Sequence, residues 1–116
     1  MSKKRRDKDF LGDIVEAMEL IGLYTKGMTY KKFLTDRKTR DAVVRNFEVM
    51  GEAAKNITAT FKAMHPEVPW KTIAGLRDKL IHFYFGVDYR IVWNIVRKEF
   101  PKIIKPVTEI FKKEMD

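Results

Sequence analysis

The chain has no cysteine, one serine (Ser2) and two histidines, His65 and His82. Without thiols it can form neither a disulfide nor a thiolate metal site, and it has no cysteine nucleophile. Ser2 is far in sequence from both histidines, which argues against serine catalysis. The histidines fit no metal-binding spacing, and no glycine-rich phosphate loop is present. The sequence therefore predicts no metal and no cofactor.

The chain also lacks a long apolar run. Its basic start is followed by Asp9, Asp13 and Glu16 instead of continuous hydrophobic sequence, which excludes a signal-peptide core or a membrane span. We therefore expect a cytoplasmic protein with no membrane partner. A length of 116 residues with 45% hydrophobic content suits one compact helical domain over residues 1–116. Residues 1–8 are expected to form a flexible basic tail.

Positive charge is in excess. The formal net charge is +8, from 24 Lys and Arg against 16 Asp and Glu. Such a balance favours a polyanionic partner, because each phosphate neutralised by a basic side chain releases counterions. Nucleic acid is the leading candidate, although many of these charges also suit the solvated faces of helices.

Apolar residues recur at helical spacing along most of the chain, and no alternating strand pattern competes. The expected helices cover residues 9–26, 36–64, 70–85, 88–100 and 103–111, with a short helical turn at 30–34. Thr29 and Asp88 are expected N-caps, and Gly51 is expected to mark a close helix contact. Short connections favour antiparallel packing. The sequence thus predicts an all-α fold, an up-and-down bundle of four to five antiparallel helices.

Polar residues crowd onto two turns of one otherwise apolar helix, Gly75-Leu-Arg77-Asp78-Lys79-Leu-Ile-His82-Phe-Tyr84. Asp78 and His82 are four residues apart, so the carboxylate could orient the imidazole. Arg77 and Tyr84 are seven apart and nearly aligned. Arg77 and His82 lie roughly 140° apart around the helix axis, so one helix cannot easily bring them together.

A twofold dimer would solve that geometry, because it brings two copies of Arg77 and His82 into one cleft. One histidine could take a proton from a nucleophile while the other gives a proton to a leaving group. On RNA the nucleophile would be the 2′-hydroxyl beside the scissile phosphate, and Arg77 would stabilise the charge that develops there. No metal is needed for this chemistry.

Structural roles also account for these residues. His82 could be a satisfied histidine at an interface, and Tyr84 could bury its ring with the hydroxyl at the surface. Arg77 could pair with Glu48 or Glu52 across the bundle. The pattern alone does not decide between these roles and catalysis.

The sequence closely resembles the HepT-like branch of the HEPN superfamily, the toxin half of HEPN/MNT toxin–antitoxin pairs. The segments that carry the resemblance are residues 9–14, 33–36, 41–55, 66–70, 73–84 and 87–93. Arg-x4-His is weak evidence alone but specific within this order of segments. The resemblance implies a HEPN-like homodimer whose Arg77 and His82 form a metal-independent endoribonuclease at the dimer cleft.

In this branch the motif extends to Arg-x4-His-x-Tyr, matched by Arg77, His82 and Tyr84. The resemblance implies that an MNT-type nucleotidyltransferase antitoxin attaches AMP to Tyr84, within a homodimer or a larger assembly with that antitoxin. ATP would then be the antitoxin's substrate and not a cofactor of this chain. Asp78, a candidate site-supporting residue, stands where the family often has Asn. Its charge could weaken RNA binding or raise the pKa of His82.

A second function stays open from the sequence. The chain could be a non-catalytic helical dimer that binds a nucleotidyltransferase partner or RNA without cutting it. Asp78 and the dispersed positive charge motivate this alternative.

Overall fold

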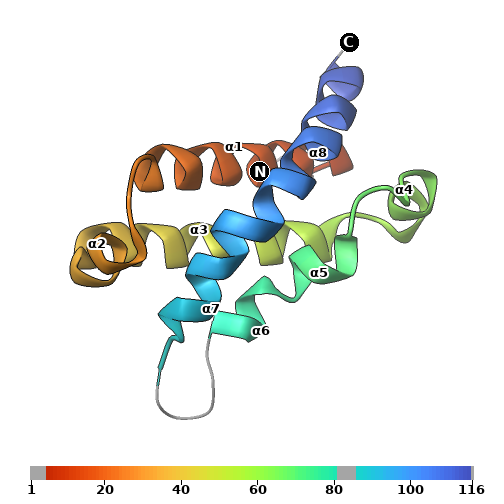
Figure 1. The fold of residues 1–116 in the computed structure, drawn as a ribbon. Coiled ribbons are helices and arrows are strands. Elements are labelled where there is room, and N and C mark those ends of the chain that lie inside the picture. Colours follow the sequence, from red (N-terminus) through yellow and green to blue (C-terminus); the bar gives the residue numbers. More distant parts are fainter. Residues whose placement is uncertain (1–4, 81–85, 116) are drawn as a thin grey trace.

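The computed structural model describes residues 5–80 and 86–115, and its regular secondary structure is helical throughout these ranges (Figure 1). The predicted all-α fold is confirmed. The helices are α1 (Asp7–Thr25), α2 (Tyr30–Thr35), α3 (Arg37–Asn56), α4 (Ala59–Met64), α5 (Trp70–Ala74), α6 (Leu76–Leu80), α7 (Tyr89–Asn94), the π-helical turn η1 (Ile95–Glu99) and α8 (Phe100–Met115). None of these helices is both long and apolar enough to cross a membrane.

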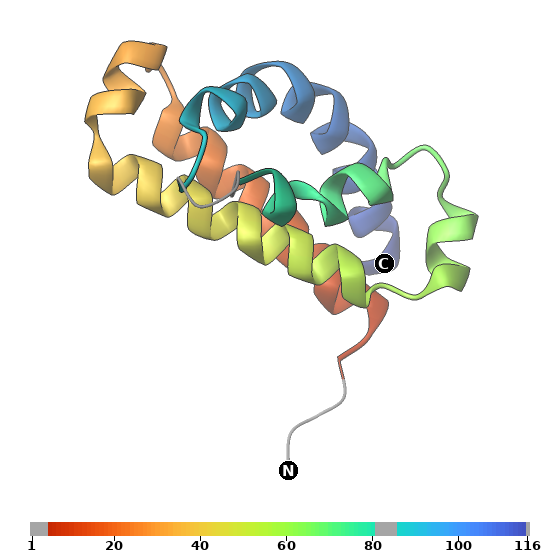
Figure 2. The ribbon, with the colours of Figure 1, turned by 90° about the horizontal axis from the view of Figure 1, so that it is seen from below.

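The core forms between α1 and α3, which run antiparallel side by side, and α8, which crosses them (Figures 1 and 2). Each of the three helices contributes fully or almost fully buried apolar side chains at helical spacing. They include Leu11, Ile14, Met18 and Ile21 of α1, Val43, Phe47, Met50 and Ala54 of α3, and Ile103, Val107 and Ile110 of α8. Burying each large apolar side chain contributes about 1.5–3 kcal/mol, so this three-helix contact is the main source of stability.

Polar side chains cap the helices. The Thr29 hydroxyl accepts a hydrogen bond from the Lys32 N–H, and the Asp88 carboxylate accepts from the N–H groups of Arg90 and Ile91. Both predicted caps are confirmed. Asp36 caps α3 by accepting from the Thr39 N–H at 3.0 Å, and this bond holds the pKa of the Asp36 carboxyl below its usual value.

The single helix predicted over residues 36–64 is divided into two, α3 and α4, at Ile57 and Thr58. The chain leaves the helix at Ile57, whose backbone is extended (φ −73°, ψ 136°), and α4 starts anew after Thr58. Thr58 caps α4 by accepting from the Phe61 N–H. The Asp7 carboxylate accepts from the Thr58 N–H at 2.8 Å and from its hydroxyl at 2.7 Å. These polar contacts offer the backbone an alternative to continued helix.

The predicted helix end at Pro101 is also wrong, because the chain stays helical from Tyr89 to Met115. Pro101 has no N–H to donate to the carbonyl four residues back and would crowd it. The turn before it widens into η1, where the Phe100 N–H donates to the Ile95 carbonyl, five residues back. This wider turn accommodates the proline without ending the helix.

Candidate active site on α6

Helix α6 presents Arg77 and Asp78 at the surface. The preceding Leu76 is only 1% exposed and anchors the helix in the core, whereas Arg77 and Asp78 are exposed. Ile73, one turn earlier in α5, is fully buried and anchors the segment that precedes α6 in the core. The local sequence therefore fixes the backbone and leaves two charged side chains available to a ligand.

The backbone of α6 packs closely against Gly51 of α3. A methyl group at Gly51 would lie 3.4 Å from the Ala74 carbonyl oxygen, 3.4 Å from the Arg77 nitrogen and 3.5 Å from the Arg77 Cβ. These are van der Waals distances, so α3 and α6 touch at the residue that carries the guanidinium. The close helix contact predicted at Gly51 is confirmed, and its partner is the candidate catalytic arginine.

The predicted single helix from Trp70 onward is divided at Gly75. Gly75 (φ −83°, ψ −2°) separates α5 from α6, and its N–H donates to the Lys71 carbonyl at 3.0 Å. A Cβ at this position would lie 3.3 Å from the same carbonyl oxygen, which is tighter than ordinary contact. The glycine thus allows the close turn that aims α6 away from the axis of α5.

His82 and Tyr84 lie outside the described residues. The expected pairing of Asp78 with His82 and the expected alignment of Arg77 with Tyr84 lie outside them as well. The flanks of these residues are described: α6 packs against α7, and Gly86 has a φ of 91°, which favours glycine. The helices on either side of the undescribed residues, α6 and α7, therefore lie against each other.

The proposed structural pairing of Arg77 with Glu48 or Glu52 is not observed, although all three residues are described. Among the interactions of described residues, no ion pair joins Arg77 to either glutamate. Glu48 and Glu52 instead line an open groove together with Arg45 and Arg5, and Arg77 is not part of its lining. Within the described ranges no three His, Asp or Glu side chains lie close enough to hold a metal ion.

One feature of the surface was not predicted from the sequence. Arginines stack on aromatic rings where α2, α3, α7 and η1 meet: Arg40 on Tyr89, Arg90 on Tyr30, and Arg97 on Trp93. The available signal was the recurrence of Arg and Tyr or Trp in residues 30–40 and 89–97. Sequence spacing could not show that these two segments meet.

Comparison with known proteins identifies the family. The profile of the family described as "Ribonuclease HepT-like" matches residues 14–110, which include the whole Arg77 to Tyr84 motif. No solved structure matches the chain.

Relatives match over nearly their full length. The chain is 51% identical over 100 residues to "Probable ribonuclease HepT" of Thermococcus cleftensis, covering 86% of this chain and 91% of the relative. It is 50% identical over 109 residues to a "Putative RNase" of Methanocaldococcus jannaschii, covering 94% and 90%. A "Putative RNase" of Caldanaerobacter subterraneus is 45% identical over 107 residues, covering 92% and 96%. With a family match across most of its length and relatives at this level of identity, the chain belongs to the HepT-like ribonuclease family.

Proposed function

We propose that the chain is the endoribonuclease toxin of a HEPN/MNT toxin–antitoxin system and cuts RNA without a metal at the cleft of a homodimer. The main observation in support is the position of Arg77. Its side chain is exposed, and its backbone packs against Gly51 of α3. Membership of the HepT-like ribonuclease family supports RNA as the substrate.

The proposed reaction uses side chains from the two copies of this chain in the dimer. One His82 takes the proton of the 2′-hydroxyl, whose oxygen attacks the adjacent phosphorus and forms a new P–O bond. The bond from phosphorus to the 5′-oxygen breaks, and the partner's His82 gives that oxygen a proton. The guanidinium of Arg77 binds the non-bridging oxygens and stabilises the charge of the pentacoordinate transition state. The products are a 2′,3′-cyclic phosphate and a 5′-hydroxyl.

Asp78 is proposed to position His82 from the preceding helical turn. A carboxylate at this place favours the protonated imidazole, which suits the histidine that acts as the acid. It also adds negative charge beside the phosphate, so it opposes RNA binding by Arg77. We expect Asp78→Asn to bind RNA more tightly and to shift the acidic and basic limbs of the pH–rate profile.

Tyr84 is the proposed point of control. An AMP group attached to its hydroxyl by an MNT-type nucleotidyltransferase antitoxin would place a phosphate near Arg77 and block RNA by charge and bulk. The antitoxin uses ATP in this step, transferring AMP to the tyrosine oxygen and releasing pyrophosphate. Mass spectrometry of Tyr84→Phe and wild-type chains purified with the antitoxin tests this role, because only the wild type should gain the mass of AMP.

The proposed nuclease is tested with purified, unmodified protein and RNA in EDTA. Wild type should cut the RNA, and both variants should lose cleavage by at least about a hundredfold: His82→Ala because it removes acid–base catalysis, and Arg77→Ala because it removes stabilisation of the transition-state charge. Circular dichroism checks that both variants are folded. Cleavage that stops on chelation would contradict the metal-free mechanism. RNA bound tightly by wild type but left intact would favour the non-catalytic dimer, an alternative that the charge of Asp78 motivates.

A further inference from the structure

Three arginines of one surface present their guanidinium groups on aromatic rings. The carbon at the centre of each guanidinium lies 4.5 Å from the ring centre of Tyr89 for Arg40, 4.6 Å from that of Tyr30 for Arg90 and 4.3 Å from that of Trp93 for Arg97. A guanidinium stacked on a ring keeps its N–H groups directed outward from its edge. That geometry suits bidentate contact with a phosphate.

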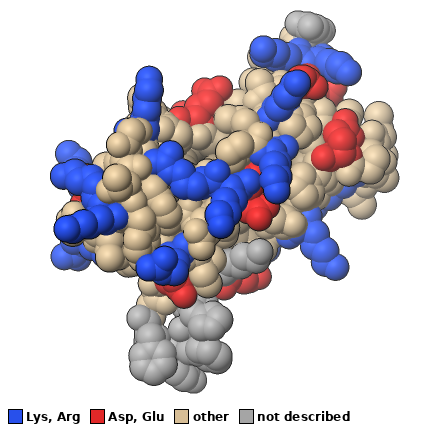
Figure 3. Space-filling view, viewed as in Figure 1, with Lys and Arg blue, Asp and Glu red and all other residues tan. Residues whose placement is uncertain are grey.

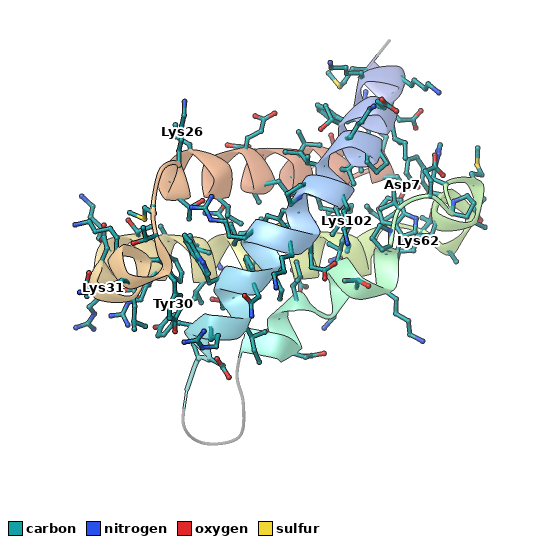
Figure 4. All side chains as sticks on the ribbon, in the orientation of Figure 1. Asp7, Lys26, Tyr30, Lys31, Lys62 and Lys102 are labelled. Carbon is teal, nitrogen blue, oxygen red and sulfur yellow. The ribbon has the colours of Figure 1, made fainter. Side chains whose placement is uncertain are left out.

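The rings beneath these arginines form one continuous group. Trp93 lies 6.3 Å from Tyr30 and 5.1 Å from Phe33, and Phe33 lies 6.3 Å from Tyr89, all between ring centres. Phe33 is fully buried and the other three rings are partly buried, so the group is anchored in the core. Figure 4 shows Tyr30 between α2 and α7. We refer to Tyr30, Tyr89, Trp93, Arg40, Arg90 and Arg97 as the arginine–aromatic surface.

The surrounding charge is strongly positive. Residues 26–41 and 88–99 contain nine Lys or Arg and four Asp or Glu, so they carry five of the chain's eight net positive charges. Two of the four acids, Asp36 and Asp88, accept hydrogen bonds from backbone N–H groups as helix caps. Figure 3 shows Lys and Arg gathered over α2 and over the α7–α8 stretch. The charge complements a polyanion over the whole surface.

Structural roles account for only part of this arrangement. Arg97 donates to the carbonyls of Thr25 and Met28 at 3.0 and 2.6 Å, and so holds the α1–α2 connection. Arg90 is exposed, and its side chain has no hydrogen bond or ion pair with another described residue. The Nε of Arg40 is buried without a hydrogen-bond partner among the described residues. The buried Nε of Arg40 is not accessible to a phosphate. The terminal guanidinium nitrogens of Arg40 and Arg90 stack on rings and form no hydrogen bond or ion pair with another described residue, so they remain available to a ligand.

The surface lies within reach of the candidate active site. Arg40 and Gly51 are both in α3, eleven residues apart, and Gly51 contacts the backbone of Arg77. At about 1.5 Å per residue this separation is roughly 16 Å along the helix. A nucleic-acid strand advances about 3.4 Å per nucleotide in a duplex and more when extended, so about five nucleotides or fewer cover the distance.

We infer that the arginine–aromatic surface binds the single-stranded stretch of the RNA substrate a few nucleotides from the cleaved phosphate, with the guanidinium edges of Arg40 and Arg90 on phosphates, and with bases against the outer faces of these ring-stacked guanidinium groups. The inference rests on the proposed function, because it names where that substrate continues beyond Arg77. Proteins that bind single-stranded nucleic acids without sequence preference commonly use such a combination of aromatic rings and arginines.

The test measures RNA binding separately from RNA cleavage. The full chain with His82→Ala binds a fluorescein-labelled single-stranded RNA of mixed sequence, and anisotropy gives the affinity over a series of salt concentrations. In this background Arg40→Ala with Arg90→Ala should weaken binding roughly ten- to a hundredfold, and should reduce the slope of log K against log salt by about 1.4 for two lost phosphate contacts. Arg40→Lys with Arg90→Lys should restore the slope but only part of the affinity.

A matched control variant separates a specific loss of RNA contacts from a general loss of positive charge. Lys112→Ala with Lys113→Ala removes the same charge from exposed positions at the end of α8 and should change affinity by less than about threefold. Equal losses in both double variants, or unchanged affinity in Arg40→Ala with Arg90→Ala, would overturn the inference. So would loss of nucleotidyltransferase binding with RNA affinity intact, which would make the surface a protein interface. RNA cleavage by the wild-type chain is measured in parallel. Intact RNA in that assay would contradict the proposed nuclease function, whereas the binding measurements test whether the arginine–aromatic surface binds RNA.

Discussion

Gly51 couples the packing of α3 to the position of Arg77. A methyl group fits there at contact distance, and alanine is about 1 kcal/mol better than glycine inside a helix. We therefore expect Gly51→Ala to keep RNA cleavage and to unfold at the same or a higher temperature. Gly51→Leu adds carbons that must push α6 away, so cleavage should fall at least about tenfold and stability by roughly 1–3 kcal/mol.

Gly22 of α1 provides the matched control for this pair of substitutions. It is exposed, and a Cβ there meets nothing within 4 Å. Gly22→Leu should therefore be tolerated in both stability and cleavage. If Gly51→Leu behaves like Gly22→Leu, the contact between Gly51 and Arg77 does not position the site.

The Asp36 carboxylate makes a pH-dependent contribution to stability. Its pKa is lowered in the folded chain, mainly by the backbone N–H of Thr39, so the carboxylate stabilises the fold above its ordinary pKa. As pH falls through the folded pKa, this contribution is lost. Asp36→Asn keeps a side-chain acceptor but does not titrate. The unfolding temperature of wild type should exceed that of Asp36→Asn at pH 7, and the difference should shrink as the pH falls below the ordinary pKa of an aspartate and through the lowered folded pKa. A constant difference would contradict the role of the charge.

The junction of η1 with the α1–α2 connection depends on Arg97. Its guanidinium donates to the backbone carbonyls of Thr25 and Met28 and stacks on Trp93; the Thr25 carbonyl also accepts from the Met28 N–H. Arg97→Ala should lower the free energy of unfolding by roughly 1–2 kcal/mol, because both carbonyls lose a charged donor. Urea denaturation measures the change. The neighbouring exposed Lys98→Ala should stay within about 0.5 kcal/mol, and equal effects would remove the special role of Arg97.

The helices were largely predictable because their apolar periodicity is strong. The core positions of α1, α3 and α8 and the caps at Thr29 and Asp88 follow directly from residue type and spacing. The breaks at Ile57 and Gly75 were not predictable from periodicity, since apolar residues continue across both. The Asp7–Thr58 bonds that fix the first break join residues 51 positions apart, which no local pattern reveals.

The candidate site was predictable only in part. Motif and resemblance single out Arg77, and its exposure beside a buried Leu76 agrees with a contact to a ligand. Neither indicated that Gly51 touches Arg77. Apolar periodicity shows which face of a helix is buried, but it does not show which residues of another helix that face contacts. The arginine–aromatic surface depends on α2 meeting α7, a tertiary contact between segments more than fifty residues apart.

A shared site makes activity depend on both subunits. If each cleft needs two His82 side chains, a heterodimer of wild type and His82→Ala is inactive. Equal amounts of the two chains, unfolded and refolded together, should then retain about one quarter of the activity of the wild type at the same total concentration. Retention of about one half would show that each wild-type subunit works alone. A mixture with refolded Lys113→Ala, which should keep full activity, controls for refolding losses.

The central claim is that RNA is cut by its own 2′-hydroxyl at a site made of Arg77 and His82 without a metal. The most direct measurement compares two oligonucleotides in EDTA with unmodified wild-type chain, one all-RNA and one with a single 2′-deoxy nucleotide at the mapped cleavage position. The account predicts that the all-RNA strand yields a 2′,3′-cyclic phosphate and a 5′-hydroxyl, and that the 2′-deoxy strand stays intact at that position. Cleavage at the 2′-deoxy position, or products that carry a 5′-phosphate, would contradict it.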